Sequence, residues 1–365
     1  MKLKYLLSFF LVVIFLFSAL DSDAQRRRRN KYRKRKVRHK NISHYRGGSV
    51  GGKFRPYSFV SFNLNALNYY GDLAPLANAT STDISWTRPG AGVNIGYKFS
   101  PYAAFRAGFN YGRITGNDNV SNPNSPNDAP RYMRNLSFRN DIKEFQMGFE
   151  LYFLPNHGGP NVRQRINAYL FVGGAVFAHN PKGLVPDKDY TTGGTTPAPD
   201  AGKWVALRPL GTEGQNIKGV GVTKKYSLIQ PAIPVAIGAK LRLPGPFDLG
   251  FEVSYRFLFT DYLDDVSANY VPFDKFTDPL ARIMSDRSAE PFNVSTRKPR
   301  DVKVSSMTLS DGVTYYSWGD IGGGIANSDT KPAQRGNPHH NDTYLMTTIR
   351  LTWILGKTRR TAKFR

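Results

Sequence analysis

The feature that most constrains the fold is a strict alternation of apolar and polar residues along several short segments. In the clearest segment, residues 144–153, every second residue from Phe145 to Phe153 is apolar, and the positions between hold Glu, Gln, Gly or Tyr. A period of two places alternate side chains on opposite faces of a β-strand. The segment therefore predicts a strand with one apolar and one polar face.

The same pattern recurs along the rest of the chain. Alternating segments cover residues 60–66, 93–99, 105–112, 247–257 and 348–356. Residues 166–178 and 226–241 are apolar enough to form strands with weaker alternation. We therefore predict an all-β fold of about eight strands.

The links between the predicted strands alternate between long and short. The long links span about 70–90, 113–142, 179–225 and 260–343, and the short links span 100–101, 154–165 and 244–246. Outer-membrane barrels have short periplasmic turns and long extracellular loops. A final link of more than 80 residues would be unusual in a compact soluble domain. The link pattern therefore favours a membrane barrel over a soluble sandwich.

The aromatic residues support the same choice. Many stand near the ends of the predicted strands, where a membrane barrel carries its interfacial girdles. They are Tyr69, Tyr70, Tyr102, Tyr111, Tyr152, Phe153, Tyr344 and Trp353. In a soluble sandwich the apolar faces would pack on each other; in a barrel they face lipid. We predict a transmembrane antiparallel β-barrel of about eight strands with long extracellular loops.

In such a barrel the polar faces of the strands line the lumen. Charged residues of both signs occupy the predicted inward positions of six strands: Lys98, Arg106, Glu144, Glu150, Lys240, Glu252, Arg256 and Arg350. An eight-stranded barrel is just wide enough to be filled by side chains, and an unpaired buried charge is costly. The charges therefore predict a plug of salt bridges, with an ion path or proton relay as the alternative.

The first 24 residues predict export from the cytoplasm. Lys2 and Lys4 precede an apolar run from Tyr5 to Leu20, and Ser22 and Ala24 are small residues in the right places for cleavage after Ala24. This is the pattern of a secretory signal peptide. The alternative is an uncleaved anchor, but the run is shorter than the roughly 20 residues that span a bilayer. We therefore expect an outer-membrane location in a Gram-negative cell and no nucleic-acid partner.

The positive charge lies mainly in two tails. The chain has 51 Lys and Arg, 27 Asp and Glu, and a formal charge of +24; residues 26–40 hold eleven basic residues and residues 357–365 hold five, with no acid in either run. The candidate partner-binding or lipid-binding residues are Arg26, Arg27, Arg28, Arg29, Lys31, Arg33, Lys34, Arg35 and Lys36. One interpretation is a solvated tether. The others are attraction to lipopolysaccharide phosphates or docking on an acidic protein.

Six short motifs resemble one protein family. They are residues 68–73 (NYYGDL), 88–92 (RPGAG), 134–139 (RNLSFR), 207–215 (LRPLGTEGQ), 259–267 (FTDYLDDVS), and 335–338 (RGNP) with Asn341 and Asp342. In this order they resemble the PorG-like outer-membrane β-barrel proteins of the type IX secretion system in Bacteroidetes. The resemblance runs from about residue 57 to 356. It does not cover residues 26–50, and the basic tail 357–365 also departs from it.

The resemblance implies a non-enzymatic role. It implies a barrel that associates with the periplasmic ring of the secretion machinery, made of PorK- and PorN-like proteins, and helps tie that ring to the outer membrane. The expected organisation is a signal peptide (1–24), a basic periplasmic arm (25–56), the barrel (57–356) and a basic tail (357–365). A free-standing envelope barrel is the alternative.

The sequence offers little for catalysis or metal binding. There are no cysteines, which excludes disulfides, thiolate metal sites and a cysteine nucleophile. Ser, His and Asp occur in the predicted loops, but no Gly-x-Ser-x-Gly motif supports a lipid-modifying enzyme. Asp261, Asp264 and Asp265, with Asp72 and Glu213, would offer oxygen ligands to a divalent cation, although acidic turn residues commonly make local hydrogen bonds. We predict no cofactor, no metal and no small-molecule substrate.

Overall fold

The structure is a computed structural model. It describes residues 54–74, 86–118, 129–156, 159–160, 163–220, 224–318 and 333–355, all within the compact unit Lys53–Arg365. The predicted signal peptide, almost all of the basic arm and the basic tail lie outside the described residues, so these predictions remain untested.

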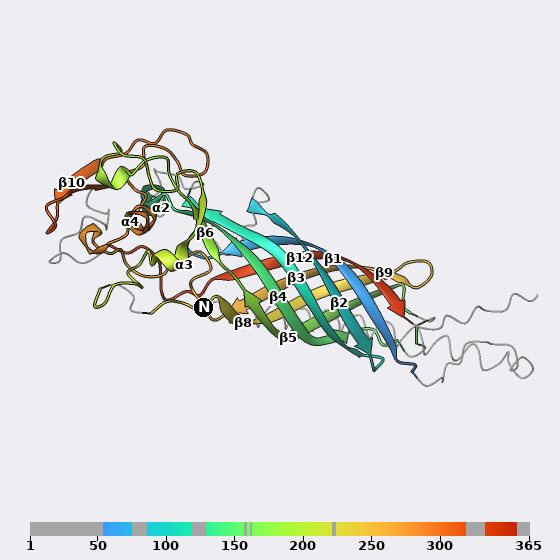
Figure 1. Cartoon of the computed structure of the whole chain (residues 1–365). Helices are drawn as coiled ribbons and strands as arrows, with labels where there is room; N and C mark the ends of the chain where they lie inside the picture. The colour runs from blue at the N-terminus through green and yellow to red at the C-terminus, as the bar shows by residue number, and fades with distance from the viewer. Residues whose placement is uncertain are drawn as a thin grey trace, which may run out of the picture. The chain divides into compact units, whose positions relative to one another are not determined.

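Eight antiparallel strands form a closed barrel (Figure 1). They are β1 (Tyr57–Tyr70), β2 (Arg88–Lys98), β3 (Ala103–Asn117), β4 (Ser137–Tyr152), β5 (Ile166–Ala178), β8 (Ile229–Arg242), β9 (Phe247–Leu258) and β12 (Thr343–Leu355). Each strand pairs with the next, and β12 returns to β1 in a register that runs from Ser58 opposite Leu355 to Tyr70 opposite Thr343. The predicted all-β, eight-stranded antiparallel barrel is confirmed.

The apolar faces of the strands point outward. On β4, Phe145 and Phe149 are 47% and 52% exposed, whereas Gln146 and Glu150 are buried. The outward side chains of the other barrel strands are also mainly apolar, and most of their polar side chains face inward, together with apolar ones such as Phe171 and Phe177 on β5. A soluble protein would bury the apolar set, because removing it from water stabilises the fold. Here lipid takes that place, as in a transmembrane barrel.

The barrel interior has three layers along its axis. Near the short-turn end, Phe59, Phe171 and Ile354 belong to one buried apolar cluster. The charged side chains follow. Beyond them, towards the long-link end, inward residues such as Phe138 and Tyr344 form a second apolar cluster with Leu263, which belongs to the last long link.

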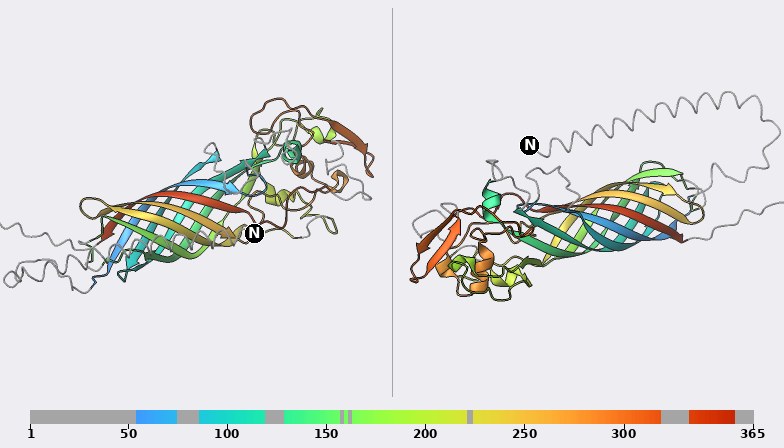
Figure 2. Two further views of the ribbon diagram at one scale, coloured as in Figure 1. Left: turned by 180° about the vertical axis from the view of Figure 1, so that it is seen from behind. Right: turned by 90° about the horizontal axis from the view of Figure 1, so that it is seen from above.

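The described parts of the long links contribute further elements at one end of the barrel (Figures 1 and 2). These are α2 (Ala129–Arg134), β6 (Pro181–Leu184), η3 (Tyr190–Thr192), β7 (Trp204–Ala206), α3 (Leu207–Leu210), η4 (Phe273–Lys275), α4 (Pro279–Ser285), β10 (Val304–Thr308) and β11 (Thr314–Trp318). We call the described parts of these links (71–74, 129–136, 179–220, 224–228, 259–318 and 333–342) the cap. No helix among the described residues is long and apolar enough to cross a membrane.

One boundary differs from the sequence prediction. Residues 113–142 were expected to be a link, but β3 continues to Asn117 and β4 begins at Ser137, with pairing throughout. Two contacts explain the extension. Arg113 forms an ion pair with Asp141 at 2.6 Å on the outer face, while Ile114 and Ile142 join the inner apolar cluster. The β3–β4 hairpin is therefore longer than the alternating pattern predicted.

Candidate functional site: a lumen network and a cap network

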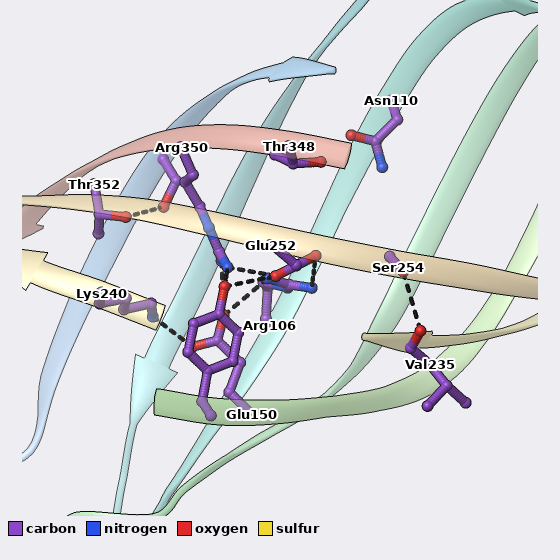
Figure 3. Close-up of polar contacts among 12 residues, drawn as sticks. Arg106, Asn110, Glu150, Val235, Lys240, Glu252, Ser254, Thr348, Arg350 and Thr352 are labelled. Carbon is purple, nitrogen blue, oxygen red and sulfur yellow. Dashed lines mark hydrogen bonds and ion pairs between the residues drawn. The ribbon is translucent and has the colours of Figure 1, made fainter. Parts of the chain in front are cut away.

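The centre of the lumen holds two arginines between two glutamates (Figure 3). Arg106 Nη1 donates to Glu150 Oε1 at 2.9 Å and to Glu252 Oε2 at 2.7 Å. Arg350 Nη1 donates to Glu150 Oε1 at 2.7 Å, and its Nη2 donates to Glu252 Oε2 at 2.6 Å. These groups come from β3, β4, β9 and β12, so the network joins strands on opposite sides of the barrel.

A lysine and two tyrosines complete this network. Lys240 Nζ donates to Glu150 Oε2 at 2.6 Å and to the Tyr152 hydroxyl at 2.8 Å. The Tyr169 hydroxyl donates to Glu252 Oε2 at 2.7 Å. Each buried glutamate therefore has several charged or hydroxyl donors, which is the condition under which a buried ion pair is tolerated.

Aromatic rings provide further contacts to the buried cations. The Arg106 guanidinium lies 3.8 Å from the centre of the Phe171 ring, and Lys98 Nζ lies 3.4 Å from the centre of the Tyr152 ring. A cation held over a ring face is attracted by the ring quadrupole, more strongly when water is excluded. These contacts help the lumen accept more basic than acidic side chains.

A second ion pair lies nearer the cap. Arg256 Nη2 donates to Glu144 Oε1 at 3.1 Å, and Glu144 Oε2 accepts from the Tyr344 hydroxyl at 2.6 Å. Asn110 Nδ2 donates to Glu144 Oε1 at 3.1 Å. All the charged residues that the alternation assigned to the lumen, Lys98, Arg106, Glu144, Glu150, Lys240, Glu252, Arg256 and Arg350, are buried inside the barrel. The nine basic residues named in the arm, from Arg26 to Lys36, lie outside the described residues.

The lumen contains little free space at its short-turn mouth. A cavity of about 30 Å³ lies there among Tyr57, Lys98, Tyr152, Lys240 and neighbouring side chains. Such a volume holds one or two water molecules. With the arginine–glutamate network across the middle, the interior is a packed polar plug.

The cap holds a second polar network, centred on Tyr69 at the end of β1. The Tyr69 hydroxyl lies 2.7 Å from both Asp264 Oδ2 and Asp342 Oδ1. A phenol carries one hydrogen, so it donates to only one of these oxygens. The second contact is a hydrogen bond when the other carboxyl is protonated and donates to the phenol oxygen. The geometry therefore fits a state in which one of the two carboxyls is protonated, and we call that hydrogen the shared proton.

The pKa values of these carboxyls fit the shared proton. Burial, followed by the charge of Asp72, raises the pKa of Asp264 to about 8. Burial and then the neighbouring Asp264 raise the pKa of Asp342 well above its usual range. Backbone amides offset part of the cost: Leu263 N donates to Asp342 at 2.8 Å, and Val266 N donates to Asp264 at 2.9 Å.

Arg335 joins two long links to each other. Its Nη1 donates to Glu213 Oε1 at 2.9 Å and to the Asp265 carbonyl oxygen at 2.6 Å, and its Nε donates to the Ser285 carbonyl oxygen at 3.0 Å. Asp265, which has a positive φ of 69°, accepts from the Thr212 hydroxyl at 2.5 Å. The links 179–228 and 259–342 are thereby held together by buried polar contacts.

Arg134, at the end of α2, connects three further segments. It donates to both carboxylate oxygens of Asp118 at 2.9 and 2.8 Å, to the Asp72 carbonyl oxygen at 2.8 Å, and to the Arg335 carbonyl oxygen at 2.6 Å. A guanidinium offers five donors in a fixed plane, which suits it to bind several partners at once.

The alternation pattern carried no signal for Arg134 or Arg335. The motif segments contain both, together with Tyr69. The expectation that Tyr69, Tyr152 and Tyr344 belong to an interfacial girdle is wrong, because all three are buried and their hydroxyls bind carboxylates.

Four of the five acidic residues considered for a divalent cation take a different role: Asp72, Asp264, Asp265 and Glu213 accept hydrogen bonds from backbone amides, hydroxyls or Arg335. The fifth, Asp261, is also buried, and burial raises its pKa to about 8. Over the described ranges, no group of three or more His, Asp or Glu side chains has an arrangement that could hold a metal ion. The cluster therefore supports a structural interpretation.

Fold and networks together define the class: a closed, eight-stranded antiparallel barrel with an apolar exterior, a polar plug and a folded cap. A family model described as a domain of unknown function, DUF6089, matches residues 59–197, which include β1 to β5 and part of the following link. No curated protein matches the chain.

Three solved structures illustrate the fold likeness. Neisserial surface protein A is 8% identical, with 81% of this chain and 96% of that chain covered and a TM-score of 0.31. Ail, the attachment invasion locus protein of Yersinia pestis, is 7% identical, with 82% and 99% covered and a TM-score of 0.32. A major outer membrane protein from Thermus thermophilus is 9% identical, with 82% and 99% covered and a TM-score of 0.30. The strand pairing itself, and not these likenesses, establishes the barrel.

Proposed function

We propose that this chain is a non-enzymatic, non-conducting outer-membrane barrel that associates with the periplasmic ring of a type IX secretion machine and helps tie the ring to the membrane. The observation that carries the proposal is the distribution of buried contacts. The lumen is filled, and Leu263 and Val266 of the cap are buried among inward residues of the strands. This leaves the short turns and the two tails as the surfaces that a periplasmic partner would contact.

The arrangement of the motifs supports the family resemblance. Five of the six motif segments contribute to the cap network, through Asp72, Arg134, Glu213, Asp264 and Arg335. Segments far apart in sequence that meet in one buried network are constrained together. This supports a shared architecture with the PorG-like proteins, in which the motifs shape the cap and leave partner contact to the other end.

The charge at the short-turn end favours an acidic partner. Arg55, Arg165 and Arg242 are exposed there. The nearby Asp248 is buried and forms an ion pair with Arg163 at 3.0 Å. The basic arm would add to this positive surface, and complementary charge speeds association and orients the partners. On this proposal PorK- and PorN-like ring proteins bind at this end.

The test is affinity purification of the tagged protein from mildly cross-linked outer membranes, followed by mass spectrometry. We expect ring proteins with the wild type, and less of them with Arg55→Glu combined with Arg165→Glu. A charge-matched control, Lys298→Glu with Lys303→Glu, changes exposed cap residues and should leave recovery unchanged. Recovery of the folded barrel alone from wild-type membranes would contradict the proposal and favour a free-standing envelope barrel.

A second comparison addresses the basic arm. Deleting residues 26–40 should leave membrane insertion intact and reduce recovery of the ring proteins, with a larger effect at low salt because exposed charges are screened over about 8–10 Å. Unchanged recovery at low salt would show that the arm has no part in binding.

A further inference from the structure

On the side of the barrel formed by β3, β4, β5 and β8, the outer surface changes from apolar to basic along one row of residues near the cap. The pairings of β3, β4, β5 and β8 place Tyr111 beside Lys143, Lys143 beside Ala178, and Ala178 beside Ile229. Two positions further from the cap, the outward residues are Phe109, Phe145 and Val176, all exposed. This line of residues therefore marks the edge of the apolar band on that side.

On the cap side of this line the outer surface is rich in cations. The basic residues at or above the line are Arg113, Arg139, Lys143, Lys182, Arg208, Lys224 and Lys225. The neighbouring outward acid is Asp141, which Arg113 already pairs at 2.6 Å. A net positive surface therefore lies directly against the apolar band, at the height where lipid head groups begin.

Three of these cations surround an open hollow of about 560 Å³ at the start of β8. Arg208, Lys224 and Lys225 line it together with Tyr226 and Tyr262. Arg208 is held in place by its Nε, which donates to the Tyr226 carbonyl oxygen at 2.7 Å. Within the part of the chain that the structure describes, no acidic side chain lines this hollow. The positive charges of Arg208, Lys224 and Lys225 are therefore available to an anionic ligand.

The hollow is lined by aromatic side chains and, towards the apolar band, by aliphatic side chains. The rings of Tyr226 and Tyr262 stack at 4.7 Å with an angle of 9° between their planes. Leu228 and Ile229 complete the wall towards the apolar band, and Ile229 is 64% exposed. Tyr226 itself is buried, with its ring between those of His179 and Tyr262, so the half-buried Tyr262 is the aromatic surface that a sugar ring would contact, next to the cations and the exposed Ile229.

The opposite side of the barrel is different. The outward positions of β9, β12 and β1, as far as the structure describes them, contain no Lys or Arg. Their cap-side ends carry aromatic residues such as Tyr70, Phe257 and Phe259, the last of which is 58% exposed. The outward positions of β5 and β8 contain no Lys or Arg either, so the cations of the basic surface come from β3, β4 and the link 179–228.

We propose that this basic hollow, with Lys143 beside it, binds the phosphorylated sugar head of an outer-leaflet glycolipid of the lipid A type. A free phosphate would use only the cations, whereas a glycolipid would also use Tyr262 and the adjacent apolar band. The inference rests on the proposed outer-membrane location and does not depend on the secretion role.

The test is titration of the detergent-solubilised full chain with a bisphosphorylated lipid A disaccharide, read by native mass spectrometry. The variant combines Lys143→Gln, Lys224→Gln and Lys225→Gln, all at exposed positions. Each basic residue near a charged lipid surface contributes about 1 kcal/mol, so the triple variant should bind about 100-fold more weakly. Heat-modifiable migration on gels verifies that the variant is folded.

The control removes the same charge elsewhere, through Arg297→Gln, Lys298→Gln and Lys303→Gln in exposed parts of the cap, and should bind as the wild type does. Dephosphorylated lipid A should bind weakly, and inorganic phosphate should not compete at equal concentration. Equal weakening in both triple variants would overturn the proposal, as would equal binding of the dephosphorylated lipid. Effective competition by inorganic phosphate would show that the hollow binds phosphate alone, and it would contradict binding of a glycolipid. Recovery of ring proteins from membranes is a separate readout, so failure here leaves the proposed function standing.

Discussion

The lumen network and the cap network stabilise their buried charged groups in different ways. In the lumen, Glu150 contacts Arg106, Lys240 and Arg350, Glu252 contacts Arg106 and Arg350, and Glu144 contacts Arg256, so each of these glutamates has at least one positive partner. Around Tyr69 in the cap, Asp264 and Asp342 meet each other across one hydroxyl, and their other partners are backbone amides. The first network is held by opposite charges and the second by a shared proton.

Because of this difference, the lumen should be sensitive to the loss of a charged side chain and the cap should be sensitive to pH. Removing one ion from the lumen leaves its partners uncompensated in a medium that screens them poorly. In the cap, the stability depends on a protonation state, and therefore on pH.

The largest effect is expected from Glu150→Ala. The substitution leaves Arg106, Lys240 and Arg350 without their shared carboxylate, and breaking a buried pair costs about 3–5 kcal/mol. The urea midpoint of the folded band on unheated gels should fall accordingly. The control is Lys203→Ala, which removes an exposed ion pair with Asp200 of 2.7 Å and should leave the midpoint almost unchanged, because exposed ion pairs contribute little to stability. Similar midpoints for the two variants would contradict the lumen account.

Arg335→Met should destabilise the cap and leave the barrel intact. It leaves Glu213 and the carbonyl oxygens of Asp265 and Ser285 without this donor, at a cost of about 2–4 kcal/mol for a buried charged group. Limited proteolysis should cut residues 259–342 faster, while the heat-modifiable migration of the barrel stays unchanged. Loss of the folded band would show that cap and barrel are not separate.

Gly71→Ala should disturb the shared proton by packing alone. A Cβ at this position would overlap Asp342 Oδ1 and the Tyr69 hydroxyl, whereas a Cβ at Gly174 on β5 would meet nothing within 4 Å. Overpacking costs about 1–3 kcal/mol, so proteolysis of the cap should accelerate for Gly71→Ala. Gly174→Ala should be neutral or slightly stabilising. Equal behaviour of the two variants would count against the close contact at Tyr69.

The smallest effect is a loss of cap stability between pH 6 and pH 7. Burial raises the pKa of Asp264 to about 8 in the folded cap, against 3.8 for the free carboxyl. The folded cap therefore binds a proton that the unfolded chain has lost, and stability falls as pH rises from about 4 to about 8. One pH unit within this window corresponds to about 1.4 kcal/mol for one proton. Hydrogen-exchange protection factors of the cap should decrease while those of the lumen strands stay constant.

The barrel could be predicted because its signal is local. The alternation along residues 144–153 reports which neighbours share a face, and the same period assigned Glu150, Arg256 and Arg350 to the interior. The period carries no information on which side chains pair with each other across the lumen. Which arginine contacts which glutamate depends on strand register and barrel closure, which bring residues 98 to 200 positions apart into contact.

The cap network could not be predicted from spacing. Tyr69 and Asp342 are 273 positions apart, and Arg335 and Glu213 are 122 apart, with no periodic pattern linking them. The acidic motif near Asp264 was therefore open to a cation site or to local turn hydrogen bonds. The structure adds the missing partner, the Tyr69 hydroxyl. The motif segments did point to the right residues, but as a family signature and not as contacts.

The measurement that tests the account most directly is conductance of the folded wild-type protein in a planar bilayer. The account treats the lumen as a packed plug held by Arg106, Arg350, Glu150 and Glu252 across the middle of the barrel. It predicts that insertion, verified by folded recovery from the bilayer, produces no stable conductance steps at neutral pH. Long-lived ohmic steps from the wild type would contradict the plug, and with it the view that this barrel serves as a fixed anchor.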